Sequence, residues 1–145
     1  METLESRCVL AEDFGDAPDT SAGTGPGNYQ TLLANGGPRH TIVAGLFLGS
    51  VVDGEANATQ NVRANGDDVT TDPDDEDGVV NPLVDLVLTA GTQPTVTLRA
   101  TNTTATNATL TGWIDYNANG VFDNATERAQ TVVQAGSNND TFTLL

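Results

Sequence analysis

The acidic segment 53–78, "DGEANATQNVRANGDDVTTDPDDEDG", most constrains how this chain can fold. It contains nine acidic residues and one arginine, and its only sizeable apolar side chains are Val62 and Val69. Such a segment buries too little apolar surface to offset the entropy lost on ordering. Two carboxylates about 4 Å apart also repel each other by about 4 kcal/mol at a protein-like dielectric. We therefore expect bound cations to order the segment, the alternative being a splayed, solvated loop.

The whole chain has a strongly acidic charge balance. Twenty acidic residues stand against five arginines and no lysine, which gives a net charge of -15. A nucleic-acid-binding protein needs a basic surface, and an anionic membrane would repel this chain. No stretch approaches the roughly 18 apolar residues of a spanning helix. We expect no nucleic acid partner, no membrane insertion, and cations as partners; alternatively, the acids only keep the surface soluble.

The apolar content is enough for one modest core. Leu, Ile, Val and Phe make up 33 of the 145 residues, just above the roughly 20% below which charged chains tend to be disordered. The chain length suits a single domain. Cys8 is the only cysteine in the sequence, so neither an intramolecular disulfide nor a cysteine-rich zinc site can form.

The C-terminal half alternates apolar and polar side chains as strands do. Val96, Leu98 and Ala100, for example, fall on one face of the stretch 94–101. Regularly spaced strands with turn signals between them are typical of all-β proteins. We therefore predict an antiparallel β-sandwich, Ig-like or jelly-roll-like, with long acidic, metal-ordered loops. The expected strands are residues 83–89, 94–101, 108–116, 128–135 and 141–145.

The N-terminal half is rich in Gly, Pro and Asp, which predicts loops that wrap the surface. Residues 40–52 are its one strongly apolar run and predict a buried strand or a pair of strands. We assign residues 13–145 to one β-sandwich domain, loop-rich to residue 82 and strand-rich from residue 83. Residues 1–12 are then an N-terminal extension, and its apolar end, "CVLA" (8–11), is a possible donated strand.

Residues 115–127, "DYNANGVFDNATE", resemble a calcium-binding loop. Their spacing matches D-x-[DN]-x-[DN]-G, the first half of the EF-hand loop, in which alternate side-chain oxygens converge on the ion and glycine permits the turn. Only three of the candidate ligands are carboxylates, so the expected affinity suits extracellular calcium concentrations. The alternative is an Asx-rich β-turn without metal. The candidate Ca²⁺ ligands are Asp115, Asn117, Asn119, the carbonyl group of Val121, Asp123 and Glu127.

A second group of acids is a further candidate cation site. Acidic residues recur around "DFGDAPD" (13–19), at 53–55 and in "DDEDG" (74–78), and we expect the fold to bring them near one another. A divalent cation would turn their mutual repulsion into attraction. The candidate ligands of this group are Asp16, Asp53, Glu55, Asp75, Glu76 and Asp77.

Several stretches, in the same order, resemble the GEVED domain of bacterial secreted and cell-surface proteins. They are "DFGDAPDT", "YQTLLANGGPRHTI", "LFLGSVVDGEA", "DDEDGV" and "WIDYNANGVF", and the likeness covers about residues 13 to 127. The resemblance implies an exported β-rich module of adhesive or wall-associated proteins, without catalytic residues. It also implies calcium positions in the loop after Trp113 and in "DDEDG". The G-E-V-E-D signature is missing, and that family would continue with another strand after "TFTLL".

Three functions compete at this point. The first is a non-enzymatic, extracellular calcium-binding structural module that forms fibres or adhesin-type surface assemblies, in which a donated strand pairs with the edge at 141–145. The second is a monomeric module of a larger secreted protein. The third, an enzyme such as a carboxylate-based glycoside hydrolase, is disfavoured because aromatic side chains that would stack on a sugar are few.

Overall fold

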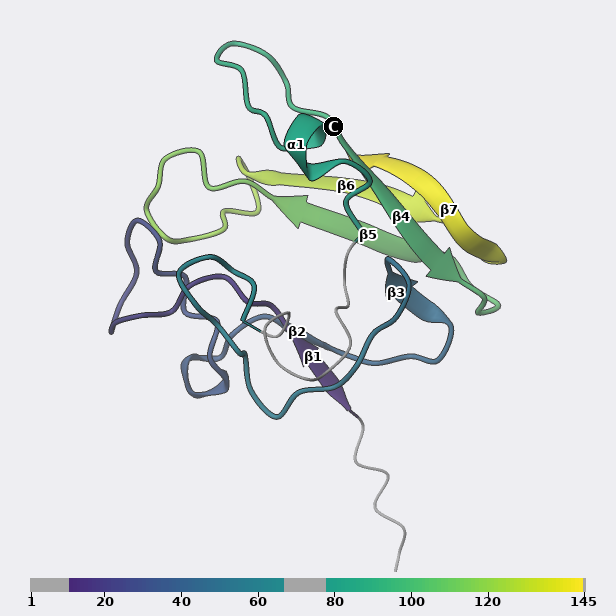
Figure 1. Cartoon of the computed structure of the whole chain (residues 1–145), viewed down its shortest axis with the longest axis horizontal. Helices are drawn as coiled ribbons and strands as arrows, with labels where there is room; N and C mark the ends of the chain where they lie inside the picture. Colours follow the sequence, from purple (N-terminus) through teal and green to yellow (C-terminus); the bar gives the residue numbers. More distant parts are fainter. Residues whose placement is uncertain (1–10, 67–77, 145) are drawn as a thin grey trace, which may run out of the picture.

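The computed structural model describes residues 11–66 and 78–144. The candidate ligands Asp75, Glu76 and Asp77, and most of the possible donated strand, lie outside the described residues. Figure 1 shows the strand-rich region above and the loop-rich region, with β1 and β2, below. The elements are β1 (Glu12–Phe14), η1 (Leu33–Asn35), β2 (Arg39–Thr41), β3 (Leu46–Leu48), α1 (Pro82–Asp85), β4 (Val96–Asn102), β5 (Ala108–Trp113), β6 (Arg128–Val133) and β7 (Ser137–Leu144).

The strands form three antiparallel sheets. β1 pairs with β2, β4 lies between β3 and β7, and β5 pairs with β6. Helix is limited, in the described residues, to the four residues of α1 and the three of η1. None of the described helices is long and apolar enough to span a membrane. The all-β prediction is confirmed.

The apolar core lies where β4 and β7 face the β5–β6 hairpin. Its buried members are Leu98, Ala100, Leu110, Val133 and Leu144. Leu98 and Ala100 come from the predicted apolar face of β4, and Val96, at the start of this strand, packs against the same cluster. The alternation in the sequence therefore placed this face correctly, because successive side chains of a strand point to opposite faces.

Asn102 is a fully buried polar side chain at the end of β4. Its amide nitrogen donates to the carbonyl groups of Thr106 (2.9 Å) and Val133 (3.1 Å). Its amide oxygen accepts from the hydroxyl group of Thr104 (2.6 Å). Because both ends of the amide are bonded, burying it costs little, and the side chain joins β4, the following turn and β6.

The strand expected at 83–89 is wrong. Residues 82–85 form the single turn α1, in which the amide groups of Val84 and Asp85 donate to the carbonyl group of Asn81. Pro82 stands at the first helical position, where its fixed φ angle suits a helix and its missing N–H costs nothing. The local backbone preference was therefore stronger than the apolar pattern.

Two other boundaries also differ from the prediction. The apolar run 40–52 forms a pair of short strands, β2 and β3, but β2 is exposed and β3 is only half-buried. The turn expected at 136–140 is largely strand, since β7 begins at Ser137 and pairs with β4 across an irregularity between Ala100 and Asn102. Asn139 has a positive φ of 56° there, a conformation that Asn tolerates better than most residues.

Buried polar side chains organise the loop-rich region. The carboxylate of Asp19 accepts hydrogen bonds from the backbone of Leu32 (3.0 Å) and from the side chain of Asn35 (2.7 Å). The amide of Asn28 accepts from Thr20 (2.8 Å) and donates to backbone carbonyl groups of the same loop. These side chains replace the strand ladder as partners of the backbone.

Candidate metal centre

The 115–127 loop begins with a turn closed by Asp115. Its carboxylate accepts hydrogen bonds from the backbone of Asn119 (3.2 Å) and Gly120 (2.9 Å). The Asn119 side chain in turn accepts from the backbone of Val121 (2.7 Å). These bonds curl the chain tightly, as the Asx-rich turn considered above requires. With the further bonds from Tyr29 and the backbone of Ala118, these bonds occupy the roughly four acceptor positions of an ionised carboxylate, so a bound cation would have to displace some of them.

Glu127 closes the other end of the loop from a buried position. Its side chain lies at the inner end of the loop and is only 5% exposed. One oxygen accepts from the side chain of Asn117 (2.8 Å), and the other from the backbone of Asp123 (2.9 Å). Asp123 accepts from the backbone of Ala125 (2.6 Å). Two of the other candidate ligands thus contact Glu127 through N–H groups, Asn117 with its side-chain amide and Asp123 with its backbone, although Glu127 stands one place later than the EF-hand glutamate.

The tip of the loop packs against the loop-rich region. Gly120 has a φ of +77°, and a Cβ atom there would collide with the backbone of Gly25 and Asn28. Beside it, the rings of Phe122 and Tyr29 stack with centroids 4.8 Å apart and planes 7° apart. Only glycine combines this conformation with so close an approach. The loop thus joins the two regions of the molecule.

Tyr29 connects this contact to the carboxylates. Its hydroxyl group donates a hydrogen bond to Asp115. Burial raises the pKa of Tyr29, and the neighbouring charges of Asp115 and Glu127 raise it further. For Asp115, burial raises the pKa, but hydrogen bonds from Gly120, Asn119 and Tyr29 outweigh this and lower it overall. Asp115 is therefore anionic at neutral pH.

Tyr29 and the Gly25–Asn28 turn are parts of this site that the sequence pattern did not reveal as partners of the loop. They lie about 90 residues before the loop in the sequence. The loop motif specifies local spacing only and holds no information on distant contacts. Tyr29 and Phe122 belong to no shared repeat or motif in the sequence, so nothing in it predicted that their rings would stack.

The structure also brings part of the second acidic group together. Asp13 is buried beside Asp53 and Glu55, and the side chains of Asp53 and Glu55 share a hydrogen bond. His40 lies 3.2 Å from the Asp13 carboxylate. The pKa of Glu55 is raised to about 7, chiefly by burial and further by the two aspartates, although the hydrogen bond from the backbone N–H of Phe14 (2.9 Å) acts to lower it.

Asp16 makes a contact of a different kind. Its carboxylate accepts a hydrogen bond from the backbone of Gly66 (2.9 Å), the last residue described before the acidic segment 67–77. This bond fixes the point at which the chain leaves the loop-rich region.

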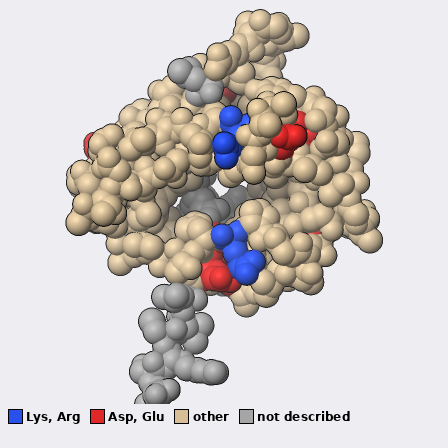
Figure 2. Space-filling model, turned by 180° about the vertical axis from the view of Figure 1, so that it is seen from behind, with Lys and Arg blue, Asp and Glu red and all other residues tan. Residues whose placement is uncertain are grey.

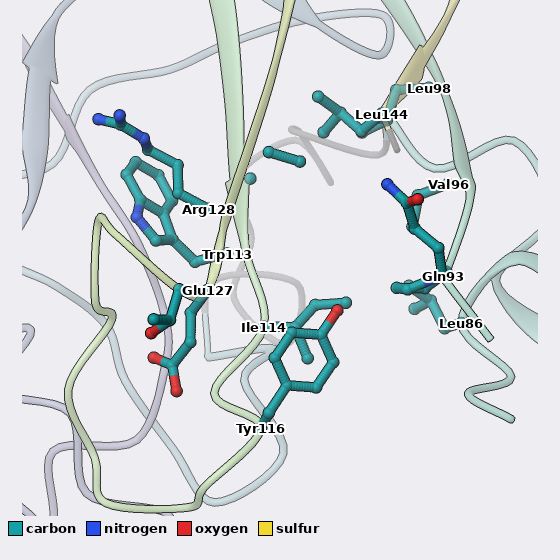
Figure 3. Close-up of a pocket in the computed structure, with 14 residues that line it drawn as sticks. Leu86, Gln93, Val96, Leu98, Trp113, Ile114, Tyr116, Glu127, Arg128 and Leu144 are labelled. Carbon is teal, nitrogen blue, oxygen red and sulfur yellow. The ribbon is translucent and has the colours of Figure 1, made fainter. Parts of the chain in front are cut away.

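A cavity of about 330 Å³ lies beside the inner end of the loop, between β5 and the β4–β7 pair. Figure 3 shows Trp113, Glu127 and Arg128 on one side, and Leu98, Leu144, Val96 and Leu86 on the other. Its lining is mostly apolar, with Gln93, Thr126, Glu127 and Arg128 among the polar exceptions. The indole N–H of Trp113 donates to Asn124 (3.0 Å).

Carboxylates, amide oxygens and a backbone carbonyl group are the hard oxygen ligands that Ca²⁺ prefers, so the chemistry of the 115–127 loop fits this ion. Within residues 11–66 and 78–144, however, there is no group of three or more His, Cys, Asp or Glu side chains that could hold a metal. Any site in this loop would therefore depend on its two asparagines and the carbonyl group of Val121.

No model of a known protein family matches the chain, and no curated protein or solved structure is significantly similar to it.

Proposed function

We propose that this chain is a non-enzymatic, extracellular structural module that Ca²⁺ stabilises, used in fibre or adhesin-type surface assemblies. In this proposal the two facing layers of the strand-rich region are the halves of a β-sandwich. The GEVED-like order of sequence motifs supports the extracellular setting. The observation that carries the proposal is the closure of the loop onto the buried Glu127 carboxylate, by N–H groups of Asn117 and Asp123, in a loop that also contacts the other region of the molecule.

Calcium in this loop would act as a clamp. It would neutralise the charges of Asp115 and Glu127, which both act on Tyr29, and fix the curvature that presents Gly120 and Phe122. Because those two residues contact the loop-rich region, the ion would stabilise both regions together. The second predicted ligand set is a weaker candidate: Asp53 and Glu55 lie together, but Asp75, Glu76 and Asp77 lie outside the described residues.

Thermal unfolding with calcium and with chelator tests the proposal. At a Ca²⁺ concentration about tenfold above Kd, we expect the Tm to rise by about 4 °C. Asp115→Asn keeps one acceptor oxygen for the turn but removes the other, together with the charge that the ion would neutralise. It should therefore lower the Tm in chelator as well, and it should abolish most of the rise that calcium causes.

Asp140→Asn is the matched control, because it makes the same change at an exposed position on β7. This variant should keep the calcium response. Equal Tm values with calcium and with chelator for the unmodified chain, together with no bound Ca²⁺ in equilibrium dialysis, would rule out the proposed role of the ion.

A further inference from the structure

Residues 80–88, which we name the apolar arm, form an exposed apolar surface at the top of the molecule. The arm comprises α1 and the first part of the projecting loop between α1 and β4 (Figure 1). Six aliphatic side chains in these nine residues each expose between 44% and 88% of their area. They are Val80, Leu83, Val84, Leu86, Val87 and Leu88. Monomeric proteins tend to expose such side chains singly, and a contiguous group of them marks an interaction site.

The arm is attached to the strand-rich region mainly at its start. The backbone N–H of Val80 donates to the carbonyl group of Thr97 on β4 (2.9 Å). From Val84 to Val87, each backbone N–H group donates to a carbonyl group three or four residues earlier, which also belongs to the arm. The arm therefore keeps its shape by local bonds and presents its side chains outward.

A hollow lies directly beside this projection. Leu86 of the arm lines the cavity of about 330 Å³ together with Val96, Leu98 and Leu144. Tyr116, which is 57% exposed, lines the same cavity. The surface thus combines a projecting apolar knob with an open apolar hole, which is the form that a self-complementary, two-fold interface needs.

The charge distribution favours association through this surface. From residue 78 to residue 98, Asp85 is the only ionisable side chain, and the top of the molecule consists almost entirely of uncharged residues (Figure 2). Two copies with a net charge of -15 each repel one another over most orientations. The neutral arm is a face on which two copies can meet with little repulsion.

The exposed apolar area matches what a dimer needs. With roughly 100 Å² of apolar area for an aliphatic side chain and roughly 200 Å² for Tyr, the arm and Tyr116 expose on the order of 500 Å². A standard interface takes about 800 Å² from each partner, of which about 57%, or roughly 450 Å², is apolar.

We infer that the apolar arm is the interface of a two-fold homodimer, in which Leu83 of each copy enters the cavity of the other. Leu83 is the most exposed aliphatic side chain of the arm, at 88%. This inference rests on the assembling role proposed above, but not on calcium, since none of the candidate ligands except Glu127 lines the cavity.

Sedimentation equilibrium of the full chain, in chelator and in calcium, tests the inference. At about 100 µM we expect twice the monomer mass of 15.0 kDa in both buffers. Leu83→Glu places a charge in an apolar hole and should raise the dimer Kd at least tenfold, as hot-spot changes do. Val62→Glu is the matched control, because Val62 is also highly exposed but lies outside the arm, and it should stay dimeric.

The possible results separate the two proposals. A monomer at this concentration overturns the inference. So does a dimer that Leu83→Glu leaves intact, for example one that is lost only when residues 1–10 are removed. A dimer in chelator that Leu83→Glu disrupts, from a chain that binds no Ca²⁺, upholds the inference and rejects the calcium role. Far-UV circular dichroism of Leu83→Glu, expected to match the unmodified chain, shows that the variant folds.

Discussion

Residues 96–144 bury aliphatic side chains between paired strands, whereas residues 11–66 bury Asp19, Asn28 and Thr31 among loops. In the paired strands of the first region the backbone bonds to neighbouring strands, and the buried aliphatic side chains fill the space between them. In the second, side chains such as Asp19 and Asn28 are themselves the partners of the backbone. A chain with few large apolar residues can therefore order a long loop region by specific polar bonds, in which each buried group needs its own partner.

The largest expected effect comes from the apolar core. Leu98→Ala removes a buried side chain shared by β4 and the facing hairpin and should lower the free energy of unfolding by about 3 kcal/mol. The loss should appear as one cooperative transition in urea unfolding. A loss below about 1 kcal/mol would show that the facing layers do not share a common core.

Breaking the contact between the regions should have a smaller effect. Gly120→Ala brings a Cβ into the backbone of Gly25 and Asn28 at a positive φ, and should cost about 2 kcal/mol. Hydrogen exchange should accelerate in residues 17–35 more than in β4. Gly136→Ala is the control, because Gly136 also has a positive φ but open space around it. Similar exchange in both variants would mean that strain alone, and not the contact, matters.

The acidic cluster of the loop-rich region should produce the smallest effect, one that depends on pH. Since the folded pKa of Glu55, about 7, lies above its unfolded value of about 4.3, the folded state holds the proton more tightly. Its contribution to stability is complete below about pH 4 and is lost as the pH rises through 7.

In chelator, Glu55→Gln should remove this pH dependence. Between about pH 5 and pH 8, the free energy of unfolding of the unmodified chain should fall by about 1 kcal/mol relative to that of the variant, after allowance for solvent screening. Urea unfolding at several pH values measures this. A difference that stays constant with pH would show that Glu55 is not desolvated.

The sequence predicted the strands of the apolar region better than any other feature. Alternation in 94–101 identified both β4 and its buried face, because a strand with one buried face must repeat every two residues. The same rule gave a wrong prediction for the arm. The apolar residues from Leu83 to Leu88 suggested a strand, but in the described part of the chain no strand pairs with them.

The candidate site was predictable only where its bonds are local. Asp115 and Asn119 close their own turn, and the spacing of the motif contained that information. The contacts of Tyr29 with Phe122 and Asp115 join residues far apart in the sequence. So do the hydrogen bonds that the backbone N–H groups of Gly66 and Leu33 donate to the side chains of Asp16 and Asn57. Such pairs leave no periodic trace in a single sequence.

The burial of Asn102 has a consequence for glycan attachment. Asn102-Thr103-Thr104 is an N-glycosylation sequon, as are the triplets that begin at Asn57, Asn107, Asn124 and Asn139. An oligosaccharide must be joined to the side-chain nitrogen, and at Asn102 this atom is enclosed and bonded to two carbonyl groups. In a host that glycosylates folded chains, Asn102 is therefore closed to modification, and a sugar added there before folding would prevent β4 and β6 from meeting.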